Sequence, residues 1–348
     1  MKKILKYLLY LVIIAVSAFA FFLIYATFDD YKPDETTLVF ESEKPDLLSD
    51  TSELSLMIWN IGYCGLNKEM DFFYDGGKNV RPLKEKVKEN LHGVKLFLQQ
   101  NMNADFILFQ EIDRDSKRSY HFNQFDTIAE MFPERNCTYG INYDVFFVPT
   151  PPTDPMGRVD GGLMTVSKYI PTNTVRYSFP GNFNWPMGLF MLDRCFLVNR
   201  YNLSNDKELI FINTHNSAYD DGTLKKQQME YLKLFLTEEY EKGNYIIVGG
   251  DWNQCPPDFT PKFKTNIMDN NIRTDIQNDY LEGWNWLYDN RLPTNRRVST
   301  PYSEGETLTT VIDFYLVSPN IETVSVKNID VGFEFSDHQP VKAVVKLK

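Results

Sequence analysis

The amino-acid sequence predicts a single layered α/β domain that follows one membrane-spanning helix. From residue 54 onward, short apolar segments rich in β-branched and aromatic residues alternate with amphipathic helical segments. No internal repeat or low-complexity tract interrupts this alternation. The chain has 348 residues, of which 43% are hydrophobic, so it is long and apolar enough to bury a substantial core.

The first element is an apolar segment within residues 1–26. Three lysines at positions 2–6 precede a run from Tyr7 to Ala26, which has about the 20 residues that a helix needs to cross a bilayer. These lysines, and Asp29 and Asp30 after the run, predict a cytoplasmic N-terminus and a periplasmic or extracellular domain. Two alternatives stay open. Ala-Phe-Ala at 18–20 resembles a signal-peptide cleavage site, which would give a secreted domain, and a buried core helix has a similar composition.

Residues 27–53 are polar and lack helical periodicity, so a linker or stalk is expected there. The folded domain is expected at residues 54–348. Its strands are predicted at residues 54–61, 105–110, 143–148, 209–213, 245–249, 311–317 and 341–347, and its helices from Pro82 and over about 224–240. The aromatic segment 179–191 is expected to form a loop or a distorted strand, and Trp185, Trp284 and Trp286 to pack under loops.

Charge and cysteine usage argue against several classes of protein. A net charge of −11 argues against nonspecific nucleic-acid binding, which depends on Lys and Arg neutralising phosphates. The adjacent Arg296 and Arg297 are expected to be solvated. The four cysteines include no C-x-x-C pair, so neither a zinc site nor a dense disulfide framework is indicated, although one or two disulfides are compatible with the sequence.

Polar groups recur where apolar strands end. They are Asn60 in WNI, Glu111 in QEID, His215 in NTHN, Asp251 and Asn253 in GDWN, and Asp337 and His338 in SDH, with Asp313 inside VIDFYLV. Ligands bind at such ends in layered α/β proteins because the sheet aims side chains that the loops expose. Each group alone has an ordinary explanation, such as a satisfied amide or an Asx turn. A buried Asp313 needs a partner, and His338 is the natural one.

Taken in order, the motifs WNI, QEID, NTH, GDWN, IDFYLVS and SDHQPV resemble the endonuclease/exonuclease/phosphatase superfamily over residues 54–348. The resemblance implies a four-layer α/β/β/α sandwich of two packed mixed β-sheets flanked by helices. It also implies an Mg²⁺- or Mn²⁺-dependent hydrolase of phosphoester bonds. Glu111 would be the main metal ligand, with Asn60 supporting that site and Asp337 assisting with metal or water.

The resemblance also implies catalytic roles. Asp251 would position or deprotonate the attacking water, and Asn253 would hold the scissile phosphate. His338, oriented by Asp313, would bind a phosphate oxygen or act as the general base, so the group that takes the proton stays open. His215 would stabilise the pentavalent phosphate, as in the deoxyribonuclease and sphingomyelinase branches.

The substrate class is less determined than the reaction. The membrane helix, the acidic charge and His215 favour a lipid headgroup or a small phosphoester, and nucleic acid is the competing class. No segment of the sequence indicates an obligate protein partner. The alternative from another class is a catalytically inactive extracytoplasmic binding domain that keeps the fold, which the presence of Glu111, Asp251 and His338 disfavours.

Overall fold

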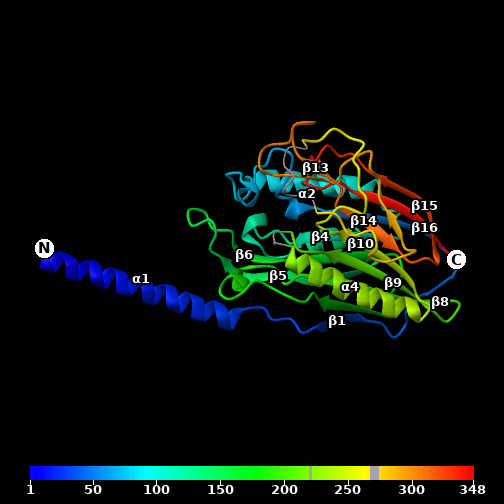
Figure 1. The fold of residues 1–348 in the computed structure, drawn as a ribbon, viewed down its shortest axis with the longest axis horizontal. Helices are drawn as coiled ribbons and strands as arrows, with labels where there is room; N and C mark the ends of the chain where they lie inside the picture. The colour runs from blue at the N-terminus through cyan, green and yellow to red at the C-terminus, as the bar shows by residue number, and fades with distance from the viewer. Residues whose placement is uncertain (219–221, 267–273) are drawn as a thin grey trace.

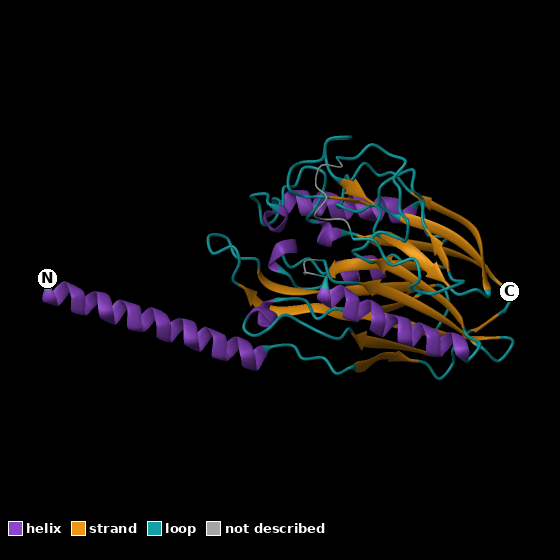
Figure 2. Ribbon diagram, in the orientation of Figure 1, coloured by secondary structure: helices purple, strands orange, loops and turns teal. Residues whose placement is uncertain are grey.

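The computed structural model describes residues 1–218, 222–266 and 274–348. Helix α1 (Lys2–Asp29) extends away from a four-layer sandwich that holds the rest of the described chain (Figures 1 and 2). Two mixed β-sheets form the inner layers, and helices cover their outer faces. The predicted fold class is therefore confirmed. Helix α1 is long and apolar enough to span a bilayer, a property that signal sequences share.

The six-stranded sheet has the order β15-β16-β3-β4-β6-β5. Its strands are β3 (Glu53–Asn60), β4 (Phe106–Asp113), β5 (Asn136–Val148), β6 (Gly157–Ser167), β15 (Ile321–Asn328) and β16 (Val341–Leu347). The outer helices on this side are α2 (Lys84–Gln99) and α3 (Gln124–Ala129).

The eight-stranded sheet has the order β1-β7-β8-β9-β10-β14-β11, with β2 paired to β8. Its strands are β1 (Thr36–Glu41), β2 (Leu47–Leu48), β7 (Asn173–Ser178), β8 (Cys195–Leu203), β9 (Glu208–His215), β10 (Tyr245–Asp251), β11 (Asn285–Leu287) and β14 (Asp313–Val317). Helix α4 (Thr223–Glu241) covers its outer face. The described residues also form a small ribbon of β12 (Asn295–Arg296) and β13 (Thr309–Thr310). Their 3-10 turns are η1 (Gly62–Cys64), η2 (Phe73–Asp75), η3 (Lys117–Ser119) and η4 (Met187–Phe190).

The two-residue period of β3 explains how the layers pack. Leu56 and Ile58 point into the core between the sheets, where they join Phe211 and Ile247 of the other sheet. Met57 and Trp59 point the opposite way, into the core under α2. Strand β3 is therefore apolar on both faces, as expected for a strand buried between two layers.

A polar contact joins the two sheets inside this core. Gln110 Nε2 on β4 donates to Asn213 Oδ1 on β9 at 2.6 Å. Asn213 Nδ2 in turn donates to the carbonyl oxygens of Phe109 and Met164 at 3.1 and 3.0 Å. Buried amides need such partners, so this network fixes how β4 and β9 face each other.

The structure corrects several predicted boundaries. Within the predicted linker, Thr36–Glu41 pairs with β7 and Leu47–Leu48 with β8, so these residues belong to the sheet. An edge strand can form backbone hydrogen bonds without an apolar side-chain pattern, so these strands could not be predicted from the sequence. Only Asp313–Val317 of the predicted strand 311–317 is one strand, and α2 begins two residues after Pro82. None of the four cysteines forms a disulfide, and all lie in the described ranges.

The strand ends that carry the predicted site face the same end of the sandwich as α1. The chain terminus lies at the end opposite to α1 (Figure 1). Lys346 pairs with Glu53, so β3 begins near that terminus and runs toward the α1 end, where Asn60 lies. Asn60 Nδ2 donates to Asp251 Oδ2 at 3.0 Å, which places the end of β10 there as well.

Candidate active site

Four of the predicted residues meet at the ends of β3, β4, β9 and β10. Asn60 Nδ2 lies 3.0 Å from Asp251 Oδ2 and 3.2 Å from Glu111 Oε1. His215 Nε2 lies 3.4 Å from Asp251 Oδ2 and 3.9 Å from Glu111 Oε1. Parallel pairing of β9 with β10 places His215 beside Asp251. The site therefore draws its side chains from both sheets.

Glu111 reaches this cluster through an irregularity in β4. The pairing of β4 with β6 shifts register between Phe109 and Ile112, and Glu111 has a φ of 54°. A positive φ is costly for a residue with a side chain and occurs where a site requires it. The bulge leaves the Glu111 side chain 23% exposed at the edge of a buried sheet, so it can meet a ligand.

The turn after β10 is held in place by its neighbours. Gly250 lies so close to β9 that a Cβ would come within 2.0 Å of the Thr214 carbonyl oxygen. Asn253, with a φ of 50°, donates its backbone N–H to Asp251 Oδ1 at 2.9 Å. Trp252 is fully buried, and its Nε1 donates to the Phe314 carbonyl oxygen at 3.0 Å. In the motif GDWN, Gly250 thus lets β10 approach β9, Asn253 fixes the turn at Asp251, and Trp252 holds the turn against the buried core.

His338 forms the predicted pair with Asp313. Its Nδ1 lies 2.8 Å from Asp313 Oδ2, and its Nε2 lies 3.7 Å from Asp251 Oδ2. The neutral ring is thereby fixed with Nε2 as the acceptor facing the cluster. Trp59 Nε1 donates to the His338 carbonyl oxygen at 3.1 Å, which secures the loop before β16. Asn295 Nδ2 lies 3.0 Å from His338 Nε2.

Asp337 lies beside this pair. Its Oδ2 is 3.9 Å from His338 Nε2, and Ser336 Oγ donates to its Oδ1 at 3.3 Å. A Cβ on Gly62 would come within 2.7 Å of Asp337 Oδ1, so only glycine leaves room for the carboxylate. Asn60 Oδ1 accepts the Gly62 N–H at 2.9 Å, which joins Asp337 to the Asn60 end of the cluster.

Burial and crowding shift the pKa values of these groups. Burial raises the pKa of Asp251 to about 6, against the opposing charge of His338. Burial likewise raises the pKa of Asp337 to about 7. For His338 burial favours the neutral ring, but the charges of Asp313, Asp337 and Asp251 hold its pKa well above the usual value. The cluster therefore holds several carboxylates around the one imidazole, His338, whose positive charge they favour.

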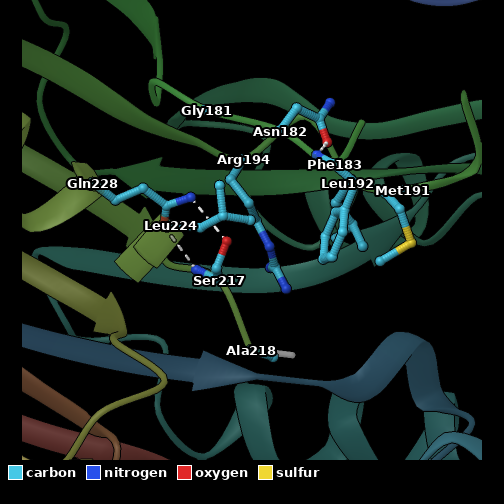
Figure 3. Close-up of a pocket in the computed structure, with 10 residues that line it drawn as sticks. All are labelled: Gly181, Asn182, Phe183, Met191, Leu192, Arg194, Ser217, Ala218, Leu224 and Gln228. Atoms are coloured by element: carbon cyan, nitrogen blue, oxygen red, sulfur yellow. Dashed lines mark hydrogen bonds between the residues drawn. The ribbon is translucent and has the colours of Figure 1, made fainter. Parts of the chain in front are cut away.

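His215 has the opposite pKa shift and lies two residues before Ser217, which lines a pocket. Burial lowers the pKa of His215 well below its usual value, and the charge of Arg194 adds to this. The Arg194 side chain lines a pocket and extends toward Ser217, two residues after His215 (Figure 3). The rest of the pocket wall is mostly apolar and is formed by residues including Phe183, Met191, Leu192 and Leu224.

The residues present fit a hard divalent cation. Carboxylates and an imidazole are ligands that Mg²⁺ and Mn²⁺ accept. Asp313 Oδ1 is buried without a hydrogen-bond partner among the described residues, and the raised pKa values call for a balancing charge. Asp251, Asp313 and His338 can each offer one ligand atom, all within 4.8 Å of one another. This set differs from the predicted ligands Glu111, Asn60 and Asp337, although the two sets adjoin.

The geometry qualifies the role predicted for Asn60. Its Oδ1 accepts from Gly62 N, and its Nδ2 faces Glu111 and Asp251. In this arrangement Asn60 positions the two carboxylates by donating to both. Asn253 Nδ2 similarly donates to the Asn216 carbonyl oxygen at 2.9 Å, which orients its amide beside the cluster.

The sequence-based expectations for Arg296 and Trp185 are wrong. Arg296 is buried, with its Nη2 donating to the Asn67 carbonyl oxygen at 2.5 Å, so it is not a solvated residue. Trp284 and Trp286 pack in the core under α4, as expected, but Trp185 is 64% exposed. Sequence reasoning missed Asn295 because it follows no apolar strand, and only its bridge to His338 brings it to the site.

Solved structures with the same fold are known. A protein from Beutenbergia cavernae described as an endonuclease/exonuclease/phosphatase is 16% identical, with 85% of this chain and 72% of that chain covered and a TM-score of 0.55. The human nocturnin catalytic domain with bound sulfate is 14% identical, with 88% and 97% covered and a TM-score of 0.54. ANGEL2, described as a 2′,3′-cyclic phosphatase, is 13% identical, with 88% and 99% covered and a TM-score of 0.54. At these identities the likeness shows the fold alone.

Family assignment rests on the sequence. No curated protein matches this chain. The sequence pattern of the endonuclease/exonuclease/phosphatase family matches residues 57–338, which is more than half of the chain, and this family generally depends on divalent metals. The chain therefore belongs to the endonuclease/exonuclease/phosphatase family.

Proposed function

We propose that the protein is a divalent-metal-dependent hydrolase of phosphoester bonds. The observation that carries this proposal is the convergence of Glu111, Asp251, His215 and His338, from four separate segments, within hydrogen-bonding or ion-pair distance of one another. Few structural roles require two histidines and two carboxylates at one buried strand edge. Family membership supports the same reaction class.

Each residue has a task in hydrolysis. His338 holds a proton at Nδ1 toward Asp313, so in its neutral form its Nε2 can accept a proton from an attacking water. Asp251 lies 3.7 Å from that Nε2 and can orient the same water. His215 and Asn253 offer N–H donors at the other side of Asp251, where they can stabilise charge on the phosphate oxygens.

Glu111 and Asp337 would hold the cation, with Asn60 fixing Glu111. A bound divalent cation supplies a Lewis acid for the charge that develops on the phosphoryl group. Asn295 Nδ2 also lies 3.0 Å from His338 Nε2, so this contact must open before Nε2 can accept a proton from water. Which of Asp251 and His338 accepts the proton would follow from the pH profiles of their variants.

Among substrate classes, a lipid headgroup or a small phosphoester is favoured over nucleic acid. The net charge of −11 gives little to bind a polyanion, and the pocket lined by Arg194 and Ser217, two residues after His215, has mostly apolar walls. Arg194 is the cation that lines this pocket, enough to contact one phosphate. The catalytic strand ends also face the end of the sandwich from which α1 leaves (Figure 1).

We infer that α1 anchors the protein and that the catalytic domain lies outside the cytoplasm. Three lysines precede the apolar run and Asp29 and Asp30 follow it, which is the charge asymmetry of an N-terminus that stays in the cytoplasm. Protease accessibility of the domain in intact cells checks this orientation. The orientation would be contradicted if the domain resisted protease added outside the cytoplasmic membrane and was cleaved only after that membrane was permeabilised.

The deciding experiment is hydrolysis by the purified full chain in detergent micelles. The substrates are bis-p-nitrophenyl phosphate, phospholipid and sphingomyelin, inositol phosphates and plasmid DNA, each with Mg²⁺, with Mn²⁺ and with chelator, alongside His338→Ala. Metal-dependent turnover that disappears in the variant supports the proposal and identifies the substrate class. Lack of turnover on every substrate, with retained ligand binding, would support the inactive binding domain.

A further inference from the structure

Helix α1 contacts the domain before its apolar run ends. All its residues up to Phe21 are exposed, whereas Phe22 and Leu23 are half-buried and Ala26 is 2% exposed. Phe22 lies four residues before Ala26, the last residue of the run, or about 6 Å along the helix axis. The domain therefore meets α1 within the stretch that a bilayer would enclose.

The domain side of this contact is aromatic. The ring of Phe22 stacks on Phe190 with centroids 5.7 Å apart. It lies 5.9 Å from the ring of Phe146 and 6.2 Å from that of Phe147. Tyr25 meets Phe146 edge-on at 4.9 Å. Phe146 and Phe147 belong to β5 and Phe190 to η4, so two separate segments of the domain contact α1 at the level of Phe22 along the helix axis.

The loop beside Phe190 adds exposed apolar groups. Trp185 is 64% exposed and Met187 is 58% exposed. Trp185 Nε1 donates to Thr27 Oγ1 at 3.2 Å, which fixes Trp185 next to the last turn of α1. Exposed groups of this size are unfavourable in water, and Trp favours the membrane interface because it has an apolar body and one polar N–H.

We propose that Phe146, Phe147, Trp185, Met187 and Phe190 form a membrane-contact face that inserts into the bilayer interface beside α1. A lipid surface is the partner that fits, because the face is continuous with the membrane-spanning helix. A net charge of −11, with Asp29 and Asp30 close by, leaves apolar insertion rather than attraction to anionic lipid as the driving force.

This face would fix the orientation of the domain as well as its distance from the bilayer. Two contacts, α1 and the membrane-contact face, prevent the rotation that one flexible anchor allows. The strand ends with Asn60 and Asp251 lie at the α1 end, so they would be held toward the headgroups. The inference depends on α1 as a membrane anchor, which is part of the proposed function, and is independent of catalysis.

The test uses tryptophan fluorescence of the full chain in phosphatidylcholine vesicles with brominated acyl chains. Trp59 and Trp252 are fully buried, Trp284 is 9% exposed and Trp286 packs in the core, so Trp185 is the tryptophan open to quenching. We expect brominated lipid to quench the wild-type protein and Trp185→Phe to lose most of that quenching. About 0.5 M NaCl should leave the quenching unchanged, because apolar insertion is not screened.

A tryptophan moved to the far end is the matched control. Val324 on β15 is 51% exposed, and β15 pairs with β16 up to the chain terminus, at the end opposite to α1. Val324→Trp in the Trp185→Phe background should not be quenched. Equal quenching of the wild type and Trp185→Phe, or of the Val324→Trp chain, overturns the inference.

Alkaline carbonate extraction separates the possible failures. Release of the full chain from membranes would show that α1 is not a membrane anchor and would overturn this inference as well. Retention without Trp185 quenching would overturn the membrane-contact face alone. Turnover of bis-p-nitrophenyl phosphate in the same preparation reports separately on the proposed hydrolase.

Discussion

Two clusters of buried charge lie at opposite ends of the eight-stranded sheet. Arg200 pairs with Ile210 near the start of β9, and Asp251 pairs with His215 at its end. At the first end, both carboxylate oxygens of Glu239 accept from Arg200, at 2.7 and 3.0 Å, and from Lys242 and Asn244, each at 2.8 Å. That cluster is electrostatically complete, as a stabilising network must be.

The active-site cluster differs because, in the part of the chain that the structure describes, its carboxylates form ion pairs with histidines and not with Lys or Arg. Asp251 lies 3.4 and 3.7 Å from the two histidines, and Asp313 Oδ1 has no hydrogen bond among the described residues. The same kind of buried carboxylate therefore has its pKa lowered at one end of the sheet and raised at the other. We infer from this difference that the Glu239 cluster stabilises the fold, whereas the carboxylates of the active-site cluster can still bind a ligand.

The largest expected effect comes from removing groups of the active-site cluster. His338→Ala and Asp251→Asn should each lower kcat/KM for bis-p-nitrophenyl phosphate by about 10³-fold or more, because proton transfer and charge stabilisation are both lost. Thermal melting should change little in Asp251→Asn, which removes one of several crowded carboxylates, and should fall in His338→Ala, which leaves the buried Asp313 without its partner. Near-normal turnover in either variant would break the assignment.

Glu111→Gln should weaken the activation of the enzyme by metal and should have little effect on the stability of the fold. The neutral amide is a poorer ligand, so the Mg²⁺ concentration for half-maximal activity should rise by about 10-fold or more. Activity measured over a Mg²⁺ titration checks this, with the exposed Glu85→Gln on α2 as the matched control. An unchanged half-maximal concentration would place the cation elsewhere.

Arg200→Met should have the complementary outcome. Loss of its charged hydrogen bonds to Glu239 should lower the free energy of unfolding by about 2 kcal/mol. Turnover per folded molecule should stay at the wild-type level, because the site lies at the other end of the sheet. The urea midpoint tests the expected loss of stability, and kcat measured on the same preparation tests the unchanged turnover. A fall in kcat while the protein is fully folded would show that the Arg200 cluster affects the active site.

The smallest effect is a pH dependence of the Glu239 contribution. Burial alone would raise the pKa of Glu239, but hydrogen bonds from Arg200 and Lys242 lower it from 4.5 to about 2. A lowered pKa in the folded state means stability that is present above 4.5 and is lost as the pH falls toward 2. The stability gap between the wild type and Glu239→Gln in urea titrations should therefore narrow over that range. A gap that stays constant would show that the charge of Glu239 does not contribute.

The strand-end residues of the site could be predicted because their signal is local. Apolar runs with a two-residue period ending in Asn60, Glu111, His215 and Asp251 identify both the strand and its exposed end. Their order along the chain then indicated the family. Segment 36–41 escaped prediction because an edge strand depends on backbone pairing with a distant strand, which leaves a weak pattern in the side chains.

The sequence by itself determined the fold class, the family, the apolar helix and most of the polar groups at strand ends, because each depends on residues close together in the chain. Only the tertiary structure decided that Asn295 contacts His338, that Arg296 is buried against backbone carbonyls, and that the site faces the α1 end of the sandwich. These features depend on pairing between distant segments, which local periodicity does not encode.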